Sequence, residues 1–156
     1  MNTIAASEAA DSYARLKSDV LQAGILDKSV SSYVPLILFA FTGYLLSLGA
    51  IVLLSDYLPL GLACLSFTFF SVQVAGLMHD TGHRAVFAST RNNDSLGYLC
   101  SCLVGMVFDN WKARHNSHHA HPNQDGSDPD MEFPFIAFSE EHYLKKRRLE
   151  RWIARR

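Results

Sequence analysis

Two long uncharged runs, separated by only five residues, constrain the fold of this chain more than any other feature. Residues 34–54 read VPLILFAFTGYLLSLGAIVLL, and residues 60–78 read LGLACLSFTFFSVQVAGLM. As α-helices these runs would measure about 31 and 28 Å, close to the thickness of a bilayer's hydrocarbon core. The segment between them, SDYLP, is long enough only for a turn. We therefore predict an all-α integral membrane protein built on a transmembrane helical hairpin, with spans near 34–54 and 60–78.

The alternative is a hairpin buried inside a soluble helical protein. A core helix of a soluble protein normally keeps a polar stripe, and neither run has one, so this alternative ranks second. The turn at 55–59 carries no Lys or Arg, whereas both outer flanks of the hairpin carry several. Because basic flanks stay in the cytoplasm, we expect a multi-pass protein with both termini on the cytoplasmic side.

The remaining segments divide the chain into three predicted units. Residues 1–30 form a cytoplasmic N-terminal unit, in which 8–23 reads as an amphipathic helix that packs outside the membrane and stops near Gly24. Its apolar face comprises Tyr13, Leu16, Val20 and Leu21. Residues 31–138 form the membrane domain, and residues 139–156 form a basic cytoplasmic tail. The apolar run 96–108 has 13 residues, which suits an interfacial or re-entrant segment better than a span.

Charge and cysteine content exclude some classes of function. The net charge is −1, which gives no indication of a nucleic-acid partner. Cys64, Cys100 and Cys102 all lie in apolar segments, and their number and spacing give neither a disulfide framework nor a zinc motif. The first 30 residues lack the pattern of a cleavable signal peptide.

Histidines gather in two clusters that flank the run 96–108. In 79-HDTGH-83 the two histidines stand four apart, and in 115-HNSHH-119 three stand at i, i+3 and i+4, so each cluster occupies one helical face. Imidazole suits Fe, Zn, Cu and Ni, and closely packed imidazoles would repel one another if protonated without a shared cation. The alternative without a metal site is a histidine-rich surface loop. We predict a metal site whose ligands are His79, His83, His115, His118 and His119, which requires both clusters to lie on the cytoplasmic side.

The other polar residues near these clusters receive different predictions. His121 precedes Pro122, which disfavours a continuing helix, and His142 lies in a solvated segment, so both are predicted non-ligands. A zinc peptidase would need H-E-x-x-H, but Asp80 stands in the glutamate's place. Asp80 could instead orient an imidazole, or be an ordinary residue at a helix end. Asn116 and Asn123 are further candidates for orienting a ligand.

Taken together, the hairpin, HDTGH, W-x-x-x-HNSHH-x-x-PN and DPD resemble the membrane fatty acid desaturases. The stretches GLMHDTGHRAVF, NDSLGYL and WKARHNSHHAHPNQDGSDPDM are most similar to the front-end, linoleoyl-CoA-desaturase-like bacterial branch. The resemblance covers about residues 11–135. His79 and His83 match the first histidine box of that family, and His115, His118 and His119 match the second.

The resemblance implies a non-haem di-iron centre that uses O₂ to remove two hydrogens from adjacent methylenes of a fatty acyl chain. It implies no catalytic residues beyond the metal ligands. Family members take electrons from a cytochrome b-class haem protein or a ferredoxin, and because the chain has no HPGG motif the donor would be separate. Fatty acyl substrate and membrane lipid are the other expected partners.

One departure from the family pattern shapes the interpretation. The family has a third histidine box after two further spans, and this sequence contains neither. We interpret the chain as an N-terminal portion of a desaturase, which would need a missing C-terminal half. The alternatives are a related di-iron fatty acyl hydroxylase and an inactive membrane-bound metal-binding fragment.

Overall fold

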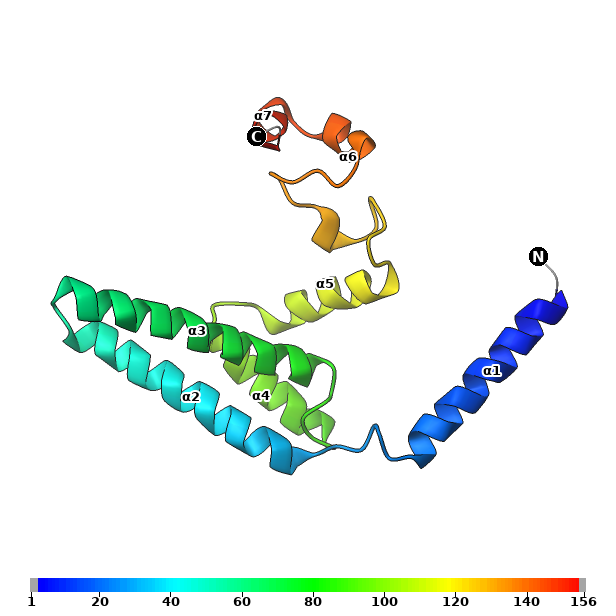
Figure 1. Ribbon diagram of the computed structural model, residues 1–156, viewed down its shortest axis with the longest axis horizontal. Helices are drawn as coiled ribbons and strands as arrows, with labels where there is room; N and C mark the ends of the chain where they lie inside the picture. The colour runs from blue at the N-terminus through cyan, green and yellow to red at the C-terminus, as the bar shows by residue number, and fades with distance from the viewer. Residues whose placement is uncertain (1–2, 155–156) are drawn as a thin grey trace.

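The computed structural model describes residues 3–154, with side chains described from residue 11 onward. Every regular element in this part of the chain is a helix (Figure 1). The elements are α1 (Thr3–Gln22), α2 (Val30–Leu53), α3 (Tyr57–Gly82), α4 (Thr90–Leu103), α5 (Phe108–Ala120), the 3₁₀ helix η1 (Pro129–Met131), α6 (Glu140–Lys145) and α7 (Arg148–Ala154). The predicted all-helical fold is confirmed for the described residues.

Helices α2 and α3 form the predicted hairpin, and both extend beyond the uncharged runs. α2 begins four residues earlier, at Val30, and α3 continues four residues further, to Gly82. The helices meet through aromatic rings, with the Phe70 ring lying over Gly43. A Cβ atom at Gly43 would lie 2.1 Å from that ring, so the glycine permits the close approach. Both helices are long and apolar enough to cross a membrane.

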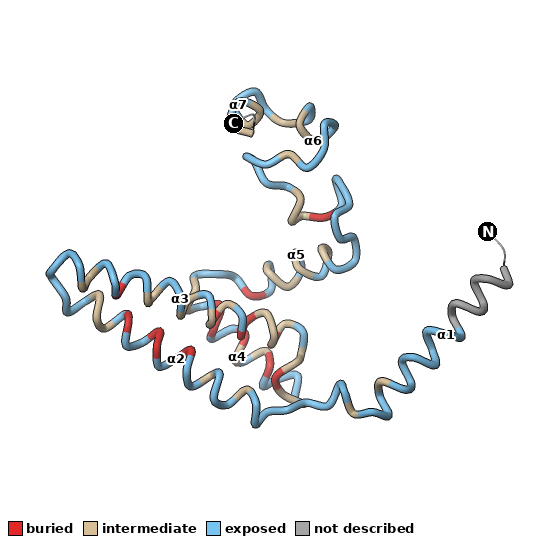
Figure 2. Tube along the Cα trace, in the orientation of Figure 1, coloured by how far each residue is buried: buried red, intermediate tan, exposed pale blue. Residues whose placement is uncertain are grey.

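The outer faces of the hairpin are apolar and exposed. Only 17% of the most apolar stretch of each helix is buried, and side chains such as Leu46 and Leu65 point away from the protein. Figure 2 shows that burial along α2 and α3 is confined to short inner stretches. A core helix of a soluble protein would be mostly buried, so the described residues do not support the soluble alternative.

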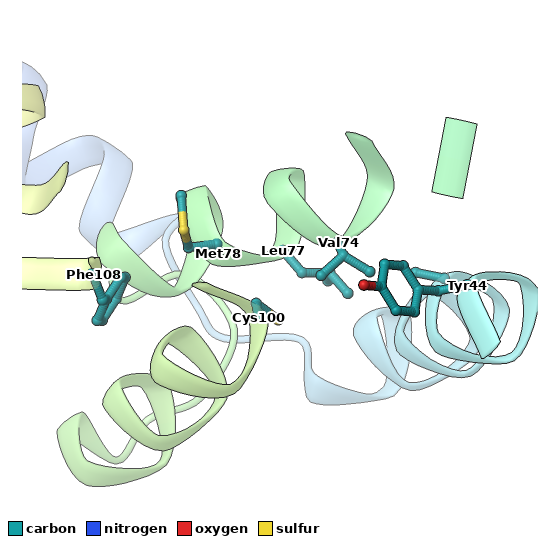
Figure 3. Close-up of a cluster of buried hydrophobic side chains, with 7 residues drawn as sticks. Tyr44, Val74, Leu77, Met78, Cys100 and Phe108 are labelled. Atoms are coloured by element: carbon teal, nitrogen blue, oxygen red, sulfur yellow. The ribbon is translucent and has the colours of Figure 1, made fainter. Parts of the chain in front are cut away.

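Helix α4 packs along the C-terminal half of α3. The two helices share a small core with α2 and α5. The core comprises Ala40, Tyr44, Val74, Leu77, Met78, Cys100 and Phe108 (Figure 3). The Tyr44 hydroxyl of α2 donates a hydrogen bond to the Leu103 carbonyl at 2.8 Å. This bond gives a partner to one of the carbonyl groups at the C-terminal end of α4, which have none within the helix.

The predicted interfacial segment 96–108 is divided between the second half of α4, a short loop and the first residue of α5. With 14 residues, α4 measures about 21 Å and is too short for a hydrocarbon core of about 30 Å. After Gly105, whose φ is +72°, the chain reverses, and α5 returns toward the end of the hairpin where α3 finishes (Figure 1). The interfacial or re-entrant placement of this segment in a membrane stays a prediction.

Helix α1 begins five residues earlier than the predicted helix 8–23. It ends at Gln22, and Gly24 follows with a φ of +66°, as expected for a glycine stop. However, α1 projects away from the other helices (Figure 1), and the side chains of Tyr13 and Leu16 are 69% and 61% exposed. Within the part of the chain that the structure describes this face stays exposed, so its packing outside the membrane stays a prediction. An amphipathic pattern identifies an apolar face but does not supply a partner for it.

Candidate metal centre

The first histidine cluster lies where α3 ends. His79 occupies the last turn of the helix, and His83 is its C-cap residue, whose backbone N–H donates to the His79 carbonyl at 3.1 Å. The two ring centroids are 4.6 Å apart. The helix thus continues past Met78, and the prediction that the two imidazoles share one helical face is confirmed.

The second cluster lies on α5, and two of its members reach the first cluster. The His115 Nε2 atom lies 3.0 Å from the His83 Nε2 atom and 3.0 Å from the His119 Nε2 atom. The ring centroids of His79 and His115 are 4.8 Å apart, and those of His83 and His119 are 4.9 Å apart. Four imidazoles from two segments of the sequence therefore converge at one end of the hairpin.

This donor set fits a transition-metal ion. Two nitrogens 3.0 Å apart have about the separation of neighbouring ligands around an ion with metal–nitrogen bonds of roughly 2.0–2.1 Å. Candidate ligand atoms of His79, His83 and His115 all lie within 4.8 Å of one another. Burial, together with the neighbouring imidazoles, lowers the pKa of both His83 and His115. Neutral imidazole is the form that binds metals, so these rings are prepared for ligation at neutral pH.

The fifth predicted ligand, His118, is held differently. Its ring centroid is 6.3 Å from that of His115, and its Nδ1 atom lies 2.9 and 3.0 Å from the two carboxylate oxygens of Asp128. With Nδ1 engaged, Nε2 is the atom left for a metal. Asp128 was missed as a site residue by sequence reasoning, although the DPD motif that contains it was visible.

The Trp111 indole joins the two halves of the site. It stacks on the His115 ring, with centroids 4.6 Å apart and planes at 16°, and it lies 5.8 Å from the His79 ring. A Cβ atom at Gly82 would lie 2.6 Å from the indole, so the glycine lets α5 approach the end of α3. Phe108, which is 1% exposed, anchors the start of α5 in the core.

The predicted orienting groups have unequal surroundings. The Asp80 carboxylate lies 3.2 Å from His79 Nδ1 and accepts a hydrogen bond from the Tyr33 hydroxyl at 3.1 Å, an arrangement suited to orienting an imidazole. The side chains of Asn116 and Asn123 make no hydrogen bond to the residues that the structure describes, so an orienting role for them stays a prediction. The two predicted non-ligands, His121 and His142, belong to neither group of candidate ligands.

The comparisons with known proteins agree with this architecture. The family model described as Fatty acid desaturase matches residues 55–156. A Delta(8)-fatty-acid desaturase of Helianthus annuus is 32% identical over 143 residues, which cover 85% of this chain and 30% of that protein. A Delta(8)-fatty-acid desaturase of Euglena gracilis is 29% identical over 149 residues, covering 88% of this chain and 32% of that protein. An Acyl-lipid (9-3)-desaturase of Borago officinalis is 33% identical over 88 residues, covering 51% and 20%.

The fold and the site define an all-helical protein in which histidine side chains cluster at one end of an apolar hairpin. Because the family model matches more than half of the chain, the protein belongs to the fatty acid desaturase family. The chain spans about a third or less of the length of the curated relatives it matches. No solved structure matches it.

Proposed function

We propose that this chain provides part of a membrane enzyme that introduces a double bond into a fatty acyl chain at a histidine-ligated di-iron site. The observation that carries the proposal is the convergence of His79, His83, His115 and His119 at one end of an apolar hairpin. Membership in the fatty acid desaturase family adds the reaction class, and the matched relatives are named as desaturases.

The hairpin places the site beside its substrate in this proposal. Lipid covers the apolar outer faces of α2 and α3, and the basic flanks keep the histidine-bearing end in the cytoplasm. In this proposal α4 does not cross the bilayer, so both histidine clusters lie on the same side of it. An acyl chain partitions into the bilayer and reaches this end of the hairpin without leaving apolar surroundings.

The chain's own residues act as ligands and as a frame for them. Acid–base side chains alone cannot break an unactivated C–H bond, so bound iron and O₂ would supply the hydrogen abstraction, with electrons from a separate haem protein or ferredoxin. The imidazoles of the two clusters offer ring nitrogens as ligands, and Trp111 and Asp80 hold two of the rings in place. Two irons take more ligands than five imidazoles provide. We therefore propose that a further polypeptide segment, equivalent to a C-terminal half, completes the centre.

Iron analysis of the purified chain in detergent tests the site. We expect iron to co-purify with the wild-type chain and to be lost from the His115→Ala variant. His142→Ala is the matched control, because it removes an imidazole that lies outside the cluster. Equal iron content in all three proteins would contradict the proposal.

Lipid profiling tests the reaction. The chain is co-expressed with a candidate segment that carries the third histidine box, and the fatty acids of the host are analysed. A new double bond that disappears with His115→Ala supports desaturation. A new hydroxyl group would instead indicate the hydroxylase alternative.

A further inference from the structure

The segment that follows α5 is folded around the carboxylate of Asp128. This residue is only 1% exposed. Its Oδ2 atom accepts the backbone N–H of Asn123 at 2.7 Å, and its Oδ1 atom accepts the backbone N–H of Asp130 at 2.8 Å. The remaining contact of both oxygens is with His118 Nδ1. A buried carboxylate needs such donors to offset its lost hydration, and here they also fix its position.

The same segment is fastened to one face of α5. Arg114 donates hydrogen bonds to the Asp130 carboxylate at 3.1 Å and to the Pro129 carbonyl, and Ser117 donates to the Ser127 carbonyl at 3.3 Å. Arg114, Ser117 and His118 stand at i, i+3 and i+4, so all three project from α5 toward the segment. The attachment places the Asp128 carboxylate beside the His118 ring.

His118, Asp128 and Asp130 could also be considered as a cation site of their own, since their ligand atoms lie within 4.8 Å of one another. Their partners argue against this role. Both oxygens of Asp128 already accept backbone N–H groups, and the carboxylate of Asp130 is paired with Arg114. The cluster therefore has the form of a support for His118, and the second oxygen of Asp130, Oδ2, also faces His118 Nδ1 at 3.7 Å.

We propose that Asp128 is a positioning residue for His118. It holds the imidazole in the tautomer whose proton is on Nδ1, so that the lone pair of Nε2 is available to a metal ion. The inference rests on the proposed function, because it assigns His118 to the same metal centre. Asp80 differs from Asp128 in that its side chain is 36% exposed and accepts no backbone N–H from the residues that the structure describes.

Nitrogen NMR of the metal-free, ¹⁵N-histidine-labelled chain tests the tautomer directly. The His118 signals are assigned by their absence from the His118→Ala spectrum. We expect a protonated Nδ1 and an unprotonated Nε2 near pH 7.5. A proton on Nε2 instead would overturn the proposal, and this measurement needs no variant of Asp128 that might fold poorly.

Iron affinity tests whether the support matters to the site. We expect Asp128→Asn to weaken iron binding by about 10–100-fold, the usual effect of removing a group that orients a metal ligand. Asp125→Asn is the matched control, because it makes the same change in the same segment at a carboxylate that faces Lys145. The control should bind iron as the wild type does.

A double variant distinguishes positioning from a general structural role. If Asp128 acts through His118, then Asp128→Asn should weaken iron binding little further in a chain that already carries His118→Ala. If instead the two substitutions weaken iron binding by factors that multiply in the double variant, the proposal is overturned. Wild-type affinity in Asp128→Asn would also overturn it while leaving the proposed function intact. A wild-type chain that binds no iron would instead count against the proposed function, and the tautomer measurement would still decide the orientation of His118.

Discussion

The two halves of the histidine site are built in different ways. His79 and His83 continue a helix whose preceding residues, Leu77 and Met78, are buried at 1% and 2% exposure. The α5 half is anchored by two aromatic rings, Phe108 and Trp111, and by the polar contacts of the segment around Asp128. The α3 half is thus fixed by the packing of the hairpin, whereas the α5 half depends on the contacts of a few individual side chains. We therefore expect the α5 half to be the easier one to displace.

The largest expected effect comes from removing the aromatic anchor of α5. Phe108→Ala should destabilise the packing of α5 by about 3–5 kcal/mol, because it deletes a fully buried ring. Iron affinity should fall with it, while the α2–α3 hairpin stays helical. Denaturant unfolding in detergent and iron titration measure the two effects. Phe135→Ala, at a residue that is 56% exposed, should change stability by less than about 0.5 kcal/mol.

The contact between the halves is probed next, at Gly82. Gly82→Ala should cost about 1–3 kcal/mol, because its Cβ atom would lie 2.6 Å from the Trp111 indole and force α5 outward. Gly76→Ala in the same helix is the control, since its Cβ atom would have no neighbour within 4 Å. The control should be neutral or slightly stabilising. Equal effects of the two substitutions on iron affinity would show that the halves do not depend on this contact.

A smaller effect is expected from Asp80, which supports His79 on the better-packed half. Asp80→Asn should weaken iron binding by about 1 kcal/mol, roughly fivefold, because the carboxylate is partly exposed and its hydrogen bonds are few. Tyr33→Phe, which removes the hydroxyl that binds Asp80, should have a still smaller effect. A loss at Asp80 larger than that at Asp128 would reverse the proposed order of the two carboxylates.

The smallest effect concerns pH. The pKa of His83 and His115 is lowered in the folded chain from the ordinary value of 6.5, first by burial and then by neighbouring imidazoles. The unfolded chain therefore binds more protons at these residues, so their contribution favours folding above pH 6.5 and is lost as the pH falls toward the lowered values. NMR titration of the metal-free chain should place both midpoints below 6.5. Midpoints above 6.5 would contradict the packing of these rings.

The sequence predicted the hairpin and the clustering of the histidines well, because hydrophobic run length and helical spacing are local properties. It did not predict how the α5 half is supported. The segment around Asp128 is shaped by positive φ angles at Asn123 and Gly126 and by bonds to backbone N–H groups, neither of which follows a periodic pattern.

The separate surroundings of His118 follow from helical geometry that the simple spacing argument overlooked. At about 100° per residue, His119 lies only about 40° around the helix from His115, whereas His118 lies about 100° from His119. Positions i, i+3 and i+4 share a broad face, but their rings need not reach one point. The structure accordingly places His115 and His119 with the α3 histidines and His118 beside Asp128.

We propose that imidazoles from α3 and α5 bind the same ion, and a metal titration followed by nitrogen NMR tests this proposal. Zn²⁺ serves as a diamagnetic probe for the ¹⁵N-histidine-labelled chain. We predict that the Nε2 signals of His83 and His115 shift together and reach completion at the same metal equivalent. Signals that respond at different equivalents, or only one signal that responds, would contradict the claim.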